Sequence, residues 1–166
     1  CLSIEIKHGC SGWVVGLNSA ASLIMGGCLK RALLLCGDTS TLLHSPFDKE
    51  TRPLFGDAGS CTALEFDTIA STLEFEHGTR GKDFKSIYTP VGGCRNAVTA
   101  KDLEFIEYGP NQLRRNIDCT MDGMNVFAFG MSVAPKSVKR LAEKYVLNLE
   151  QMDYLFLHQA NHYMNE

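Results

Sequence analysis

The sequence has no unbroken apolar run of the roughly 18 residues that a transmembrane helix needs. It also has no excess of basic residues, because 16 lysines and arginines face 19 aspartates and glutamates, which gives a formal net charge of −3. General nucleic-acid-binding proteins are usually basic, so this class is disfavoured. The first residues do not follow the basic, apolar and small-residue order of a secretory signal. With 45% hydrophobic and 21% charged residues, the composition is typical of a soluble globular domain.

The sequence also lacks any Cys-x-x-Cys pair, although it contains seven cysteines. We therefore predict no zinc or other metal site. The number of cysteines is odd, and several of them lie inside apolar runs such as Leu33-Leu34-Leu35-Cys36. Buried free thiols in a reducing cytoplasm explain this pattern better than a disulfide framework does. We therefore expect a cytoplasmic protein.

Both ends of the sequence fall inside predicted elements. Residues 1–6 alternate between apolar and polar as in a strand, and they begin without methionine. Residues 161–166 follow an apolar run and resemble the first turn of a helix. We therefore expect the chain to be an internal piece of a longer protein.

Between these ends, apolar runs alternate with segments of helical spacing. One predicted helix covers residues 10–25, which are apolar or small on nearly all sides and should therefore be buried. A second covers residues 123–146, where Pro135 either kinks the helix or starts a new one. The predicted strands are residues 31–36, 61–66, 71–76, 84–88 and 154–157. Residues 78–112 are predicted to be mainly loop, and the alternation of strands with helices predicts a layered α/β fold.

Cys10 stands in the run His8-Gly9-Cys10-Ser11-Gly12, after the first predicted strand and at the start of the first predicted helix. A helix N-terminus presents unpaired N–H groups and a partial positive charge, which favour the nucleophilic thiolate over the thiol. The two glycines permit a sharp strand-to-helix turn, as in a nucleophile elbow. From this run alone, a catalytic nucleophile and a buried structural cysteine are equally good interpretations.

His158 follows the predicted strand 154–157 and opens the run His158-Gln159-Ala160-Asn161. Active sites of open α/β sheets gather beyond the carboxyl ends of strands. We therefore predict that Cys10 and His158 converge as a catalytic pair, the alternative being a histidine that caps the strand or is exposed there. The other histidines are interpreted as structural or exposed residues: His8, His44, His77 and His162.

Three blocks of sequence stand in order along the chain. They are Gly9-Cys10-Ser11-Gly12, Leu54-Phe55-Gly56-Asp57-Ala58-Gly59 and His158-Gln159-Ala160-Asn161. Together they resemble the β-ketoacyl-acyl carrier protein synthase III family of the thiolase-fold condensing-enzyme superfamily. The run Met121-Asp122-Gly123-Met124-Asn125-Val126-Phe127 is a weaker match to the substrate-tunnel helix of this family. The resemblance covers residues 4–161 and is thin between 78 and 115.

The resemblance implies a thiolase-like αβαβα fold with two similar halves, of which only part is present. Residues 1–76 would be the C-terminal part of the first half, with the nucleophile. Residues 77–166 would be the start of the second half, with the catalytic histidine. Proteins of this family usually pair as homodimers, so we expect a homodimer.

The resemblance also implies a reaction. Cys10 would take an acyl group from acyl-coenzyme A, and a malonyl thioester on acyl carrier protein would then lose carbon dioxide and condense with it, in fatty acid or related acyl-chain biosynthesis. His158 would donate a hydrogen bond to the enolate oxygen, and the N–H of Cys10 would form half of an oxyanion hole. The residues at tunnel-lining positions are Phe55, Met121, Gly123, Phe127, Ala160 and Asn161. Acyl-coenzyme A and acyl carrier protein are the expected partners, with no cofactor, nucleic acid or membrane.

The sequence also departs from the family pattern. The family's third catalytic residue, an asparagine, would lie beyond Glu166, so this chain alone is expected to be inactive. Ala128 and Tyr163 stand where synthases of fatty-acid initiation often carry basic residues that face the carrier protein. Four basic residues on one face of the second helix form either a solvated surface or a docking patch: Lys136, Lys139, Arg140 and Lys144. An acyltransferase, or a non-catalytic partner subunit of the same fold, is therefore the alternative function.

Overall fold

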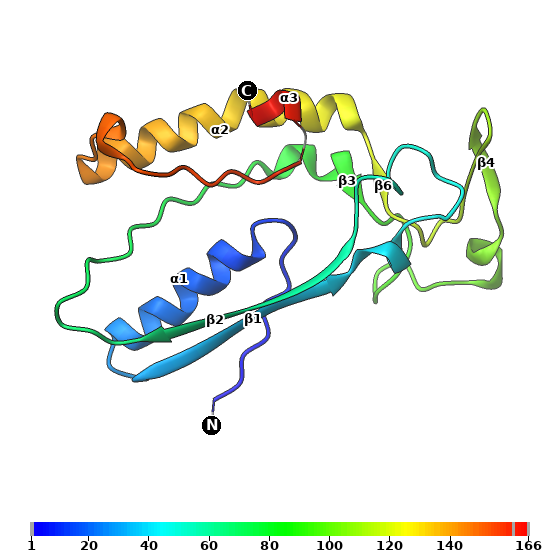
Figure 1. Ribbon diagram of the computed structural model, residues 1–166. Helices are drawn as coiled ribbons and strands as arrows, with labels where there is room; N and C mark the ends of the chain where they lie inside the picture. Colours follow the sequence, from blue (N-terminus) through cyan, green and yellow to red (C-terminus); the bar gives the residue numbers. More distant parts are fainter. Residues whose placement is uncertain (1, 161, 166) are drawn as a thin grey trace. The chain divides into compact units, whose positions relative to one another are not determined.

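The computed structural model describes residues 2–160 and 162–165 (Figure 1). The chain divides into two compact units, the first made of residues 1–38 and 58–76 and the second of residues 39–57 and 77–166. The helices are α1 (Gly12–Met25), α2 (Gly123–Tyr145) and α3 (His162–Asn165). The strands are β1 (Arg31–Thr39), β2 (Asp57–Glu65), β3 (Ile87–Tyr88), β4 (Ile106–Gly109), β5 (Gln112–Arg114) and β6 (Thr120–Met121). Short 3₁₀ helices are η1 (Ser40–Leu43), η2 (Gly81–Ser86), η3 (Ala100–Leu103) and η4 (Leu149–Gln151).

In the first unit, α1 packs on one face of the two-stranded sheet β1-β2 (Figure 1). Gly16 allows this close approach, because a Cβ built there would lie 2.6 Å from Cδ1 of Leu34. The indole Nε1 of Trp13 donates a hydrogen bond of 3.0 Å to Oγ1 of Thr62 on β2. Helix and sheet are therefore joined by one tight apolar contact and one polar contact.

The predicted helix 10–25 and the predicted strands 31–36 and 61–66 are confirmed in this unit, but the predicted burial of its apolar residues is wrong. In α1 only Gly16 and Ile24 are buried, and Met25 is 67% exposed. On the face of β1 turned away from α1, Leu33 is 69% and Leu35 is 73% exposed. A helix or strand that is apolar on all sides needs a covering layer on each side, and within this unit each has a layer on one side only.

In the second unit, α2 runs through Pro135 as one helix of 23 residues, so of the two alternatives at this proline, the start of a new helix is wrong. Asp122 caps its N-terminus by accepting a hydrogen bond of 3.0 Å from the N–H of Asn125. Val146 ends the helix in the left-handed conformation, with φ of 55°. The chain then returns along α2 to α3 (Figure 1). The side chain of Met164 in α3 fills the space beside Gly130 of α2.

A small hairpin in the second unit was not predicted. Strands β4 and β5 pair antiparallel within a stretch that the sequence indicates to be loop. Asn111 takes a φ of 58° in the turn between them, directly after Pro110. Proline followed by asparagine at the two central positions of a turn is a turn signal, so the sequence contained the information for this turn.

Three predicted strands are wrong. Residues 2–6, 71–76 and 154–157 belong to no strand of the described chain. An apolar run becomes a strand only when a neighbouring strand completes its backbone hydrogen bonds, and the run alone does not specify that neighbour. Of the predicted strand 84–88, only Ile87–Tyr88 is a strand, paired with β6, while the rest lies in η2.

The prediction of buried thiols is also wrong. All six described cysteines are free, and four of them are exposed: Cys10, Cys28, Cys61 and Cys94. Cys36 and Cys119 are half-buried. No described helix is both long and apolar enough to cross a membrane.

The most deeply buried side chains of the second unit are polar. Nε of Arg114 lies 2.8 Å from Oδ2 of Asp48, and Nη2 lies 3.2 Å from Oε2 of Glu50. Thr51 donates its hydroxyl hydrogen bond to Asp48, and the guanidinium of Arg114 lies 4.3 Å from the ring centroid of Tyr108. This Arg114 cluster joins the β4–β5 hairpin to residues 48–51.

Candidate active site

Cys10 lies exposed in a tight turn that leads into α1. The turn is closed by a hydrogen bond of 2.8 Å from the N–H of Gly12 to the carbonyl of Gly9. The N-cap residue Ser11 makes no side-chain capping bond, so it leaves the first N–H groups of α1 without that acceptor. A thiol two residues before the helix is therefore accessible and lies at its positively polarised end.

The side chain of Ser11 contacts His8 instead of the helix. Its Oγ lies 3.2 Å from Nδ1 of the imidazole, on the same turn as Cys10. We interpreted His8 from the sequence as structural or exposed, and it is exposed. His8 and Ser11 are three positions apart in the sequence. This spacing is the only sequence signal that could have indicated the contact.

The block that contains Phe55 and Asp57 is anchored by hydrogen bonds and ring stacking. Asp57 accepts 2.9 and 2.8 Å hydrogen bonds from the backbone N–H and the hydroxyl of Thr41. These bonds, with a smaller contribution from the charge of Arg52, hold the pKa of Asp57 below its ordinary value. Phe55 is half-buried and stacks on the buried ring of His44, with centroids 4.2 Å apart.

His44 was not predicted to contact this block. Its Nδ1 lies 2.8 Å from the carbonyl of Ser40, whereas Nε2 is buried with no hydrogen-bond partner in the described chain. Stacking fixes the ring of Phe55, one of the predicted tunnel residues. No periodic pattern indicated this pairing, because the two residues are joined by an irregular segment.

The Asp57 geometry predicts a pH-dependent contribution to stability. Since its pKa is lowered in the folded state, the carboxylate stabilises the fold above its ordinary pKa of 3.8, and this contribution is lost as the pH falls through the lower folded value. We expect Asp57→Asn to have a lower Tm than the wild type at pH 7. The difference between the two should shrink as the pH falls below about 4, measured by thermal unfolding followed by circular dichroism. An unchanging Tm difference across this range would contradict the role given to the carboxylate.

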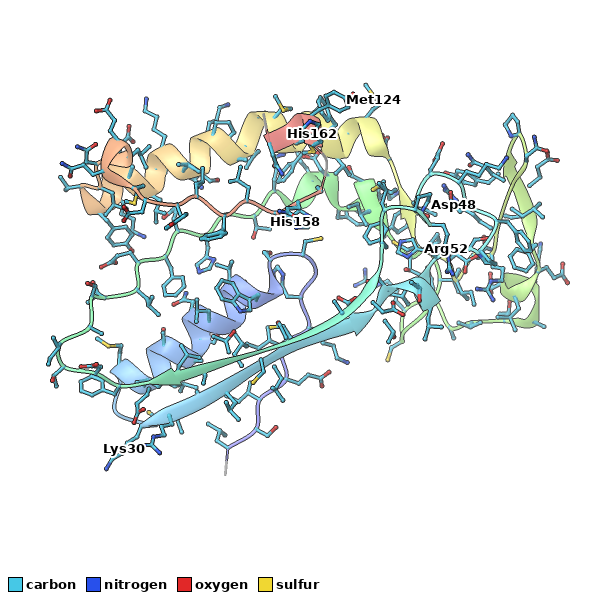
Figure 2. The ribbon with its side chains drawn as sticks, in the orientation of Figure 1. Lys30, Asp48, Arg52, Met124, His158 and His162 are labelled. Carbon is cyan, nitrogen blue, oxygen red and sulfur yellow. The ribbon has the colours of Figure 1, made fainter. Side chains whose placement is uncertain are left out.

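His158 is exposed and lies on the segment that returns along α2 (Figure 2). It does not end a strand, contrary to the prediction, because residues 154–157 have no strand partner in the described chain. Its carbonyl oxygen accepts a 3.4 Å hydrogen bond from Nδ2 of Asn165, so the residue is tied to the end of α3. Cys10 belongs to the first unit and His158 to the second, and their convergence stays a prediction.

The predicted tunnel residues come from separate segments of the second unit. Met121 is half-buried on β6 opposite Ile87, and Gly123 is the first residue of α2. Phe127 is half-buried on α2, and Ala160 is exposed just before α3. Asn161 lies outside the described residues, and its predicted role stays untested. No group of three or more histidine, cysteine or acidic residues in the described chain could hold a metal ion.

Comparisons with known proteins agree with the sequence pattern. The family model of 3-oxoacyl-[acyl-carrier-protein (ACP)] synthase III matches residues 4–81. A Campylobacter jejuni protein, provisionally described as 3-oxoacyl-[acyl-carrier-protein] synthase 3, is 31% identical over 165 residues, which are 98% of this chain and 46% of that protein. The β-ketoacyl-[acyl-carrier-protein] synthase III of Clostridium kluyveri is 28% identical over 158 residues, 95% of this chain and 46% of the relative.

Solved structures give the same result for the fold. A crystal structure of a 3-oxoacyl-(acyl-carrier-protein) synthase III superposes with a TM-score of 0.84 and 32% identity, over 96% of this chain and 48% of that one. The synthase from Burkholderia xenovorans LB400 gives a TM-score of 0.78 and 32% identity, over 99% of this chain and 45% of the other. The chain thus spans about half the length of the relatives that it matches. The α/β prediction is confirmed: the chain has part of the thiolase-type fold and is similar to β-ketoacyl-acyl carrier protein synthase III proteins.

Proposed function

We propose that the protein containing this chain is a 3-oxoacyl-[acyl-carrier-protein] synthase III-type acyltransferase of fatty acid or related acyl-chain biosynthesis. The observation that carries the proposal is an exposed thiol at the uncapped N-terminus of α1, in the block Gly9-Cys10-Ser11-Gly12 of a synthase III-like chain. An accessible sulfur at the positively polarised end of a helix suits a nucleophile that must carry negative charge during the reaction.

In the first half-reaction, the thiolate of Cys10 attacks the carbonyl carbon of an acyl-coenzyme A. A C–S bond forms to Cys10, and the C–S bond to coenzyme A breaks, so coenzyme A leaves as a thiolate that takes up a proton. The N–H of Cys10 donates to the oxyanion of the tetrahedral intermediate and serves as half of an oxyanion hole.

In the second half-reaction, a malonyl thioester on acyl carrier protein loses carbon dioxide and becomes an enolate. Its carbon attacks the acyl carbonyl, a C–C bond forms, and the C–S bond to Cys10 breaks to regenerate the thiolate. His158 donates a hydrogen bond to the enolate oxygen, where negative charge develops. The acyl and pantetheine chains run along the tunnel-lining positions: Phe55, Met121, Gly123, Phe127, Ala160 and Asn161.

The same proposal includes the organisation of the protein. Residues 1–76 are the end of one thiolase-like half and residues 77–166 the start of the other. The protein works as a cytoplasmic homodimer, with acyl-coenzyme A and acyl carrier protein as partners and without a cofactor. Four leucine side chains of the first unit are more than half exposed, which is consistent with further protein covering them: Leu2, Leu33, Leu35 and Leu73.

The test separates the two half-reactions in the full-length protein. Short acyl-coenzyme A donors should give an acyl adduct detectable by intact-mass spectrometry. We expect His158→Ala to form this adduct but to release carbon dioxide from a malonyl thioester about a hundredfold more slowly, because one stabilising donor to the enolate is lost. His162→Ala is the matched control and should decarboxylate at the wild-type rate.

The same experiment distinguishes the condensing enzyme from the two alternative functions. An adduct with no decarboxylation in the wild type would indicate an acyltransferase that does not condense, an alternative that Ala128 and Tyr163 favour because basic residues for a carrier protein are missing there. If the wild-type protein forms no adduct with any donor, the catalytic proposal is wrong and a partner subunit remains.

A further inference from the structure

The loop of residues 40–57 closes on itself within the second unit. Asp57 at its end accepts hydrogen bonds from the backbone N–H and the hydroxyl of Thr41 near its start. The rings of His44 and Phe55 both belong to this loop and stack with an interplanar angle of 19°. We call these two side chains the ring stack. The loop is therefore held together both at its ends and at the ring stack.

The imidazole of the ring stack is anchored from outside the loop. The carbonyl of Leu43 accepts a 2.7 Å hydrogen bond from the N–H of Cys119, which precedes β6. On the other side of His44, Oγ of Ser45 donates a 2.5 Å hydrogen bond to the carbonyl of Leu113 on β5. Because both chain neighbours of His44 are tied to these elements, its backbone has a fixed position in the second unit.

Hydrogen bonding accounts for only one of the two imidazole nitrogens. A carbonyl oxygen can only accept, so Nδ1 of His44 donates the 2.8 Å bond to Ser40, and Nε2 of the neutral ring is then an acceptor. This Nε2 is buried and has no hydrogen-bond partner in the part of the chain that the structure describes. A buried acceptor without a donor costs stability. What the burial of this ring provides in return is the contact of its face with Phe55.

The two rings of the stack differ in exposure. His44 is 4% exposed, whereas Phe55 is half-buried. The exposed part of the Phe55 ring is the part that can meet a substrate, and the imidazole stands behind the ring. Protein interiors are close-packed, so a ring backed by a buried and anchored side chain has little space into which it can yield. Phe55 is therefore a stiff surface.

We propose that His44 is a specificity-determining residue that restricts acyl transfer to acyl groups that are narrow beside the thioester carbonyl. The inference rests on the function proposed above, in which Phe55 lines the path of the acyl and pantetheine chains. His44 touches no substrate and acts through Phe55 as a positioning residue. With the imidazole in place, the Phe55 ring cannot move away from an acyl group that branches at the carbon next to the carbonyl. Straight acyl chains are therefore favoured over branched ones.

The test compares butyryl-coenzyme A with isobutyryl-coenzyme A as donors for acylation of the full-length protein. The two acyl groups are isomers, and isobutyryl is the wider one beside the carbonyl. In His44→Ala the Phe55 ring can turn into the space that the imidazole leaves. We therefore expect the ratio of kcat/KM for isobutyryl-coenzyme A to that for butyryl-coenzyme A to rise about tenfold over the wild type. A loss of folded protein alone leaves this ratio unchanged, because both donors are measured on the same preparation.

Two variants serve as controls. His44→Phe keeps a flat ring behind Phe55 and should keep the ratio within about twofold of the wild type. Arg52→Ala removes a 2.9 Å hydrogen bond to the carbonyl of Thr41 in the same loop, touches neither ring, and should also leave the ratio unchanged.

Each outcome gives a decision on the role of His44. An unchanged ratio in His44→Ala, or an equal rise in His44→Phe or Arg52→Ala, would overturn the inference while the acylation itself still supports the proposed function. If the wild type forms no acyl adduct with any donor, the proposed function is wrong and the inference about His44 falls with it.

Discussion

Replacing Cys10 with alanine in the full-length protein is expected to abolish the acyl adduct and to reduce acyl transfer by at least about a thousandfold. Alanine keeps the turn between Gly9 and α1 but has no nucleophilic atom. The turn is held by the backbone hydrogen bond of Gly12, which this substitution leaves in place. The variant should therefore fold like the wild type, with a Tm within a few degrees of it.

Other exposed thiols supply the control for this experiment. Cys28 and Cys61 are also free and exposed, but neither lies at the start of a helix. Cys28→Ala and Cys61→Ala should each give an adduct of the same mass and yield as the wild type. An adduct that persists in Cys10→Ala and disappears in one of these variants would move the nucleophile to that cysteine and refute the assignment.

Four described cysteines are exposed, so exposure alone does not identify the reactive thiol. The surroundings of Cys10 must distinguish it from the other three. Ser11 bonds to His8 and leaves the helix end without a side-chain cap, and a helix N-terminus favours a negative charge placed beside it. A capping side chain and a nucleophile at a helix N-terminus use the same N–H groups, so the two compete. That the run His8-Gly9-Cys10-Ser11-Gly12 serves a nucleophile stays a prediction, and the Cys10→Ala experiment tests it.

The elements that the sequence predicts well are those whose pattern is local. The helical spacing over 123–146 predicts α2, and the apolar run 31–36 predicts β1, each to within a few residues. The run 154–157 is as apolar as the run in β1, yet it is not a strand in this structure. A strand also needs a neighbouring strand to pair with, and neither run specifies which distant segment provides it.

The candidate site shows the same division between local and distant information. Cys10 and the start of α1 are predicted from five consecutive residues. The stacking of His44 on Phe55 and the pairing of Arg114 with Asp48 are not, because these contacts join segments that only tertiary folding brings together. The blocks of the resemblance name Phe55 and Asp57, but the residues that hold them in place lie outside those blocks.

The largest effect on stability is expected for Arg114. Its side chain and that of Asp48 are 2% and 0% exposed, so Arg114→Met leaves a buried carboxylate without its cation. Burial opposes ionisation of Asp48, yet the hydrogen bonds from Arg114, Thr51 and the backbone N–H groups of residues 50 and 51 outweigh it and keep its pKa below the ordinary value. Removing the arginine should lower the free energy of unfolding by about 3–5 kcal/mol, measured by urea denaturation.

Two further variants decide whether this loss comes from the unpaired charge. In the double variant of Arg114→Met with Asp48→Leu, no charge stays buried, and most of the lost stability should return, because apolar residues can replace a buried ion pair at little cost. The exposed pair of Arg31 and Glu65, with a 2.8 Å contact, is the matched control: Arg31→Met should cost less than about 1 kcal/mol. A double variant as unstable as Arg114→Met alone would mean that the arginine stabilises the hairpin mainly by packing on Tyr108. The Arg114 cluster holds β5 against residues 48–51, and the chain continues from there to Phe55. The two results therefore distinguish whether ion pairing with Asp48 or packing on Tyr108 positions this segment.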